Sequence, residues 1–289
     1  MPARTHNNNV RGDEIIKKII EVLVVIVVLI AAPAARAEFS PLIIQSGYDM
    51  ALSFSSYEYQ EPGLMSSKGI KEGLDLRATR ALENEQFIRG ELRYAFGTVD
   101  YNSDGSGSAM GEPDWYIETR VLIIGKDWLV NDAAIAPYIG FGYRYLFNDA
   151  RGSTSAGYWG YRRESNYIYL PIGFIHRTLL TDHARLVSTL EYDHLLAGKQ
   201  ISRLSDGGYG HSDVTNKQTS GYGLKLNFMY EQGSWAIGPY THFWNIGKSD
   251  WVPWYRNGIP VLDNYGRPLG GVEPQNTTVE FGLKSSYKF

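Results

Sequence analysis

The sequence predicts an all-β chain that folds as a transmembrane antiparallel β-barrel of about ten strands. Three observations predict this class: a leader of the secretory type, long segments in which apolar and polar residues alternate, and short and long connections that follow each other in turn. Alternation with a period of two fits a strand, because successive side chains point to opposite faces of a sheet.

Residues 1–37 are predicted to be a secretory signal peptide. Lys17 and Lys18 precede the apolar run VLVVIVVLIAA, and the small-residue sequence Ala35-Arg36-Ala37 follows it. This order is typical of a cleaved leader, and the apolar run is shorter than the roughly 20 residues that span a bilayer as a helix. We expect a single mature domain, residues 38–289, outside the cytoplasm.

Composition excludes several classes of function. The net charge is −3 without a basic stripe, so nucleic acid is not expected as a partner. Cysteine is absent, which excludes disulfides, thiolate metal sites and a cysteine nucleophile. We expect neither a cofactor nor a bound metal. The 21 Tyr and 7 Trp are residues that favour boundaries between apolar and wet surroundings.

Ten segments of the mature chain are predicted as strands. They are 48–60, 69–81, 86–100, 114–126, 134–148, 162–178, 184–198, 218–231, 234–248 and 277–289. In 86–100, for example, Leu92, Tyr94 and Phe96 share one face while Arg89, Glu91 and Arg93 share the other. Segments 162–178, 184–198 and 234–248 do not settle which parity is apolar, so a count between eight and twelve stays open.

The predicted connections supply an independent test. Those after the second, fourth, sixth and eighth strands are short, and those after the third, fifth, seventh and ninth are long, including an Asn/Ser/Gly loop around Asp104 and a loop around Trp159. Outer-membrane barrels have tight periplasmic turns and longer outer loops. The first outer connection, EPGLMSSK, is an exception because it is short.

The last strand indicates which solvent meets the apolar faces. Its sequence VEFGLKSSYKF places Val279, Phe281, Leu283, Tyr287 and Phe289 on one face. In hydrocarbon only helices and closed barrels pair all backbone groups, and the mature chain has no apolar span of helical length. A soluble sandwich stays open as the alternative, although soluble strands average about 5–6 residues.

The ending Tyr287-Lys288-Phe289 resembles the C-terminal signature of bacterial outer-membrane β-barrel proteins, apart from the polar Ser285. The resemblance implies a location in the cell outer membrane of a Gram-negative bacterium. It also implies outer-membrane lipid and lipopolysaccharide as surroundings, and recognition of the final strand, ending at Phe289, by the barrel assembly machinery.

The polar faces are expected to line a narrow lumen. They carry charges of both signs: Arg77, Arg89, Glu91, Arg93, Glu118, Arg120, Arg144 and Lys225. In a barrel of about ten strands such side chains fill the interior, and each buried charge needs a partner. We expect a charge-paired plug; a narrow selective channel lined by Arg89, Arg93, Arg120 and Arg144 is the alternative.

Function is then expected at the outer loops, as a structural or surface-interaction role. The candidate binding residues are Trp159, Arg162, Arg163, Trp251, Trp254 and Tyr255. Their aromatic rings suit sugar rings or a protein partner, and the arginines suit lipopolysaccharide phosphates. A place in the aromatic girdle at the membrane surface is the alternative.

The ten-strand layout also resembles that of the omptin outer-membrane proteases. In that family two acidic residues follow the third strand and an Asp-x-His pair follows the seventh. Here Glu112 and Asp114, in Glu112-Pro113-Asp114-Trp115, occupy the first place, and His211 and Asp213 occupy the second in reversed order. The resemblance implies an outer-membrane hydrolase, with His211 as general base for a water, as the enzymatic alternative.

Overall fold

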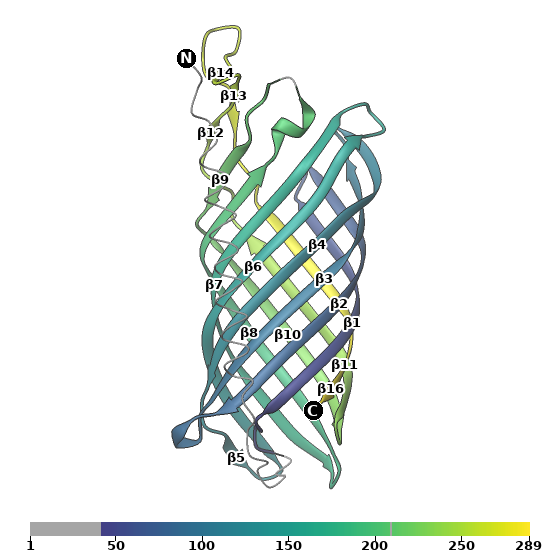
Figure 1. Ribbon diagram of the computed structural model, residues 1–289, viewed down its shortest axis with the longest axis vertical. Coiled ribbons are helices and arrows are strands. Elements are labelled where there is room, and N and C mark those ends of the chain that lie inside the picture. The colour runs from purple at the N-terminus through teal and green to yellow at the C-terminus, as the bar shows by residue number, and fades with distance from the viewer. Residues whose placement is uncertain (1–41, 209) are drawn as a thin grey trace.

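The computed structural model describes residues 42–208 and 210–289 (Figure 1). These residues form a tall barrel of long, tilted strands, with the C-terminus at its lower rim in the view of Figure 1. The predicted signal peptide, residues 1–37, and the start of the predicted mature domain lie outside the described residues. No helix in 42–208 and 210–289 is long and apolar enough to cross a membrane.

Ten strands form the barrel wall within the described part of the chain. They are β1 (Gly47–Glu61), β2 (Met65–Ala81), β3 (Phe87–Ser103), β4 (Gly107–Ile124), β6 (Ala133–Ser153), β7 (Trp159–Thr181), β8 (Ala184–Ser202), β10 (Gly221–Gln232), β11 (Trp235–Ile246) and β16 (Asn276–Lys288).

Shorter elements decorate the two ends of the wall. Near one end, β5 (Trp128–Val130) pairs with the start of β6, and near the other, β9 (Val214–Gln218) pairs with the end of β8. Two-residue strands lie in the connection between β11 and β16: β12 (Val252–Pro253), β13 (Tyr255–Arg256), β14 (Ile259–Pro260) and β15 (Gly270–Gly271). Single 3-10 turns occur at Glu83–Glu85 and Leu204–Gly207.

The sheet closes on itself. Each wall strand is antiparallel to its neighbours, β1 pairs with β16 from Asp49 opposite Lys288 to Gln60 opposite Thr277, and β8 pairs with β10. Closure leaves no free sheet edge. A sheet surrounded by hydrocarbon must have none, because every backbone N–H and C=O has to pair within the protein. The predicted fold class and the predicted number of about ten strands are confirmed.

Side chains alternate between a charged interior and an apolar exterior. On β1, Leu52 and Phe54 are 63% and 59% exposed, whereas Ser53 and Ser55 between them are buried. The other wall strands repeat this arrangement, so that large apolar residues ring the outside and ionised groups are enclosed. A soluble sandwich would bury the apolar faces in its core, and this structure exposes them instead.

Outward aromatic rings gather at two levels of the wall. One group stacks across β3, β4 and β6: Tyr94, Phe96, Trp115, Tyr145 and Phe147. The other lies at the rim that holds the C-terminus, where Trp235, Tyr287 and Phe289 meet edge to face. Aromatic girdles at both edges of the lipid are typical of outer-membrane barrels.

The structure corrects the predicted length of two loops. β4 begins at Gly107 and β7 at Trp159, so most of the residues around Asp104 and Trp159 belong to paired strands rather than loops. The high content of Ser, Asn and Gly led to the prediction of loops here. Strand formation depends on cross-strand neighbours more than on the residue itself, so composition alone was misleading. The long connections are 203–220 and 247–275, and we call the end of the barrel that carries them the outer end.

Candidate functional site at the outer end of the barrel

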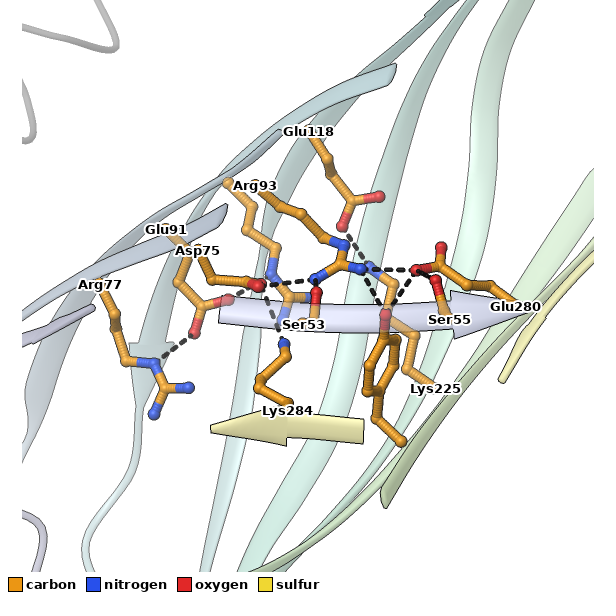
Figure 2. A network of polar contacts seen from close by, with 12 residues as sticks. Ser53, Ser55, Asp75, Arg77, Glu91, Arg93, Glu118, Lys225, Glu280 and Lys284 are labelled. Carbon is orange, nitrogen blue, oxygen red and sulfur yellow. Dashed lines mark hydrogen bonds and ion pairs between the residues drawn. The ribbon is translucent and has the colours of Figure 1, made fainter. Parts of the chain in front are cut away.

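The middle of the lumen is filled by a network centred on Arg93 of β3 (Figure 2). Its Nη2 donates to the Glu280 carboxylate of β16 at 2.5 Å, and its Nη1 donates to Asp75 of β2 at 2.6 Å. The hydroxyls of Tyr116 and Tyr240 also donate to Glu280, at 2.5 and 2.7 Å. We call this set the Arg93 network; because it joins strands from both sides of the lumen, it fills the cross-section.

A second set of ion pairs crosses from β4 to β8 and β10. Lys225 of β10 lies 2.5 Å from Glu118 and 3.3 Å from Glu191, and Arg120 lies 2.5 Å from Glu91 and also pairs with Glu191. Charges of opposite sign therefore meet across the lumen rather than along one strand.

The remaining predicted lumen residues also point inward. Arg77 and Arg89 lie 3.6 and 3.9 Å from Glu91, and Arg144 lies 3.7 Å from Glu118 with its guanidinium 4.2 Å from the ring centre of Tyr116. The sequence interpretation did not include the lumen aromatics, of which Tyr116 and Tyr240 are nearly fully buried. Strand parity could have found Tyr116, which is two residues from both Asp114 and Glu118.

The four hydrolase candidates are each held by other residues. Asp114 receives a 2.5 Å bond from the fully buried Lys71, and Asp213 receives bonds from Arg203 at 3.0 Å and the Ser205 hydroxyl at 2.6 Å. The His211 ring nitrogen lies 2.8 Å from Arg256, and Glu112 has its contact with Asn148. Across 42–208 and 210–289, no hydrogen bond or ion pair joins Glu112 or Asp114 to His211 or Asp213.

Above the lumen network lies a cavity of about 430 Å³, which we call the outer cavity. Its lining residues come from the outer ends of β1, β2, β3, β4, β6, β7 and β8, from β9, and from the connections between them and before β16. Its charged lining residues are Glu61, Glu112, Arg163 and Glu273, and its aromatic ones are Tyr101, Tyr158, Trp159, Tyr161 and Trp254. A volume in this range, with aromatic walls and a few polar groups, is typical of small-molecule sites.

Arg163 ties opposite sides of the barrel together within this cavity. Its Nη2 pairs with Glu61 of β1, lies 2.6 Å from Glu273, and its guanidinium stands 5.5 Å from the Tyr59 ring centre. In the order of the wall, β7 and β1 are equally far apart in both directions. Arg163 is therefore not free to bind lipopolysaccharide phosphates. Parity on β1 could have found Glu61; Glu273 lies in an aperiodic loop that gave no signal.

Glu112 is a buried carboxyl group in the cavity wall. It is 8% exposed and accepts one long hydrogen bond from the Asn148 amide at 3.3 Å. On β4 it lies closer to the outer end than Trp115, the ring that this strand contributes to the outward aromatic stack. The pKa of Glu112 is raised from 4.5 to about 6, mainly by burial; the Asn148 hydrogen bond and Arg163 oppose the rise, and the negative charges of Asp114 and Asp149 add to it. No ion pair to Glu112 occurs in the described residues.

Two of the other loop candidates belong to the cavity wall and three do not. Trp159 and Trp254 line it, with Trp159 64% exposed. Arg162 pairs with Asp206 at 2.7 Å, and Trp251 and Tyr255 are exposed on the connection 247–275. That connection is ordered by the β12–β15 and β13–β14 pairings and by the bridge between His211 and Arg256.

Comparisons with known proteins address the fold. No protein-family model and no curated protein sequence matches the chain. Among solved structures, the outer membrane protease OmpT from Escherichia coli aligns over 88% of this chain and 99% of that chain, with a TM-score of 0.53 and 12% identity. The chain has the fold of a bacterial outer-membrane β-barrel. At 12% identity the likeness to OmpT concerns this fold and not the protease activity.

Other outer-membrane barrels align less closely. The translocator domain of the autotransporter NalP from Neisseria meningitidis has a TM-score of 0.39 and 9% identity, covering 85% of this chain and 90% of that chain. The attachment invasion locus protein Ail of Yersinia pestis has a TM-score of 0.30 and 8% identity, covering 85% and 100%. The predicted class of small outer-membrane barrels and the predicted cell outer membrane location are confirmed at the level of the fold.

Proposed function

We propose that this outer-membrane barrel has a closed lumen and acts at the cell surface by binding a small molecule in the outer cavity. The aromatic loops form the entrance to that site. The observation that carries the proposal is the outer cavity itself, in which aromatic rings and a buried, ion-unpaired carboxyl group surround a volume of about 430 Å³.

The ion-paired lumen supports a closed barrel rather than a channel. Three of the four arginines of the predicted ladder, Arg93, Arg120 and Arg144, lie within 4 Å of carboxylates that face them from other strands. A permeant ion would have to displace these partners, and an uncompensated buried charge is costly. The Arg93 network supports this interpretation most directly, since Glu280 is 0% exposed.

An enzymatic role has weaker support. The His and carboxylate candidates are engaged with Arg256, Lys71 and Arg203 rather than with one another. A general base has to lie within hydrogen-bond reach of the water that it activates, next to the group that it attacks.

Two partners belong to the same proposal. The exposed apolar belt and the aromatic stack of β3, β4 and β6 suit outer-membrane lipid and the acyl chains of lipopolysaccharide. The assembly machinery would recognise the terminal strand, on which Phe289 is 70% exposed and its backbone N–H donates to the Tyr48 carbonyl at 2.9 Å.

Two measurements test the proposal. In planar bilayers the folded protein should give no stepwise conductance, and reproducible single-channel steps would contradict a closed lumen. In calorimetric titrations with an ammonium ion, a neutral sugar and a carboxylate, at least one solute should bind saturably. Binding should be lost in Trp159→Ala and kept in Trp128→Ala, because Trp128 is equally exposed, at 61%, but lies on β5 near the opposite end. No response to any solute would refute the binding role.

A further inference from the structure

We propose that the ligand of the outer cavity is an organic ammonium ion, a quaternary or protonated amine small enough to lie between Glu112 and the aromatic walls. This inference rests on the proposed function, because it names the class of molecule that the same cavity takes. Three features of the cavity lead to it: its charge balance, the position of Glu112 and the nature of its walls.

The charge balance of the cavity lining is negative. Glu61, Glu112 and Glu273 supply three carboxyl groups, and Arg163 is the one cation among the described lining residues. Arg163 already binds both Glu61 and Glu273, at the side of the cavity formed by β1 and the connection before β16. Three carboxyl groups against one guanidinium leave the lining with a net negative charge when the carboxyl groups are ionised.

Among the carboxyl groups of the described lining, Glu112 is the one without a cationic partner, since its one hydrogen bond comes from the neutral Asn148 amide. The nearby cation Lys71 is bound to Asp114, to both its backbone carbonyl at 2.9 Å and its carboxylate at 2.5 Å. A buried carboxylate without a cation is costly, and a cation that enters the cavity would remove this cost. An anion would add to the repulsion, and a neutral sugar would leave the charge of Glu112 uncompensated.

The walls favour a cation of the organic kind. Four aromatic side chains line the same cavity as Glu112: Tyr101, Trp159, Tyr161 and Trp254. The faces of such rings attract ammonium groups. The same protein places cations against rings below the cavity, where Lys71 lies 4.3 Å from the Tyr57 ring centre. A strongly hydrated metal ion would not gain from aromatic faces, whereas an alkylammonium ion gains from both the rings and the carboxylate.

The decisive experiment titrates the full folded protein with choline, using D-glucose and acetate as the neutral and anionic probes. We expect choline to bind and the other two not to bind. Glu112→Gln should weaken choline binding about tenfold, which corresponds to about 1.4 kcal/mol. Glu58→Gln is the matched control, since Glu58 is an exposed carboxyl group on β1 that pairs with Lys68 at 3.1 Å and does not line the cavity.

A second measurement needs no variant. Choline keeps its charge at every pH, so its affinity for the unmodified protein reports on the cavity. With the pKa of Glu112 at about 6, lowering the pH from 7.5 to 5 should weaken binding about fivefold, because the protonated form should bind about as weakly as the Glu112→Gln variant. The charged groups that act on Glu112 are Asp114 on its own strand, Asp149 of β6 and Arg163 of β7, and the cavity lining adds Glu61 and Glu273. The Arg163 guanidinium does not titrate in this range.

Each outcome separates this inference from the proposed function. Binding of glucose or acetate in place of choline would overturn the ammonium ligand and leave a ligand-binding cavity. Choline binding that neither Glu112→Gln nor acid weakens would also overturn the inference, since the carboxylate would then have no part in it. A cavity that binds none of the three probes would overturn both.

Discussion

Replacing Arg93 by Met should strongly destabilise the barrel. Arg93 donates five hydrogen bonds: to Tyr116, Ser53, Asp75, Tyr240 and Glu280. The two carboxylates respond differently to its loss. Asp75 keeps an ion pair with Lys284 at 2.9 Å (Figure 2). Glu280 keeps the hydroxyl donors, and among the residues that the structure describes no cation other than Arg93 forms an ion pair with it.

The expected magnitude follows from that difference. Glu280 has a side chain that is 1% exposed, so Arg93→Met leaves one uncompensated buried carboxylate. Breaking a buried ion pair in this way costs about 3–5 kcal/mol. Glu280→Gln in the same background should recover a large part of the loss, because an amide needs no counter-ion. The Tyr116 and Tyr240 hydroxyls bind different oxygens of Glu280, so the amide oxygen can accept from one of them while the amide NH2 donates to the other.

The assay is reversible urea unfolding of the barrel in lipid vesicles, followed by tryptophan fluorescence, for the two single variants and the double variant. Arg77→Met is the matched control. Its guanidinium is 37% exposed and 3.6 Å from Glu91, which retains Arg120, so its loss should cost less than about 1 kcal/mol. Equal losses for Arg93→Met and Arg77→Met, or no recovery in the double variant, would refute the reasoning.

Three further outcomes are expected. Glu112→Gln should raise the free energy of unfolding above pH 6 and leave it unchanged below pH 4.5: a carboxyl group whose pKa is raised by folding disfavours the folded state once it ionises, so stability curves that stay parallel from pH 4 to 7.5 would contradict this. Gly142→Ala should cost about 1–3 kcal/mol, because its Cβ would lie 2.2 Å from the buried Tyr169 ring, whereas Gly105→Ala, whose Cβ would lie 3.9 Å from the Ser103 hydroxyl in ordinary contact, should change the midpoint little. Phe289→Ala should reduce the amount of protein that reaches the outer membrane without changing its unfolding in vesicles; normal surface levels would oppose a role for the final ring.

Part of the site was accessible from the sequence because inward and outward residues alternate locally. The parity of Arg93 and Glu118 followed from their own strands, and both lie in the lumen. The same rule would have reached Glu61, which continues the inward face of β1. Glu273 and the two-residue strands around it have no period to follow, so their place at the cavity was not predictable.

The hydrolase candidates show the opposite case. Glu112 and His211 were grouped because of their positions after the third and seventh strands, and chain position alone does not fix distance across a barrel mouth. The structure pairs His211 with Arg256 of a third connection and leaves Glu112 with Asn148. Arg256 lies 45 residues from His211 in the chain, and Asn148 lies 36 residues from Glu112, so neither contact follows from local sequence.

The sequence by itself predicted a barrel and determined, in the strands that alternate clearly, which side chains share the apolar face. A period of two is a property of each strand and needs no knowledge of its neighbours. Only the tertiary structure decided which charges pair, since closure of the wall brings Arg163 to Glu61 across the mouth and Lys225 to Glu118 across the lumen. The same closure left Glu112 without an ion pair in the wall of a cavity that aromatic rings also line, and the proposed ligand site follows from that imbalance.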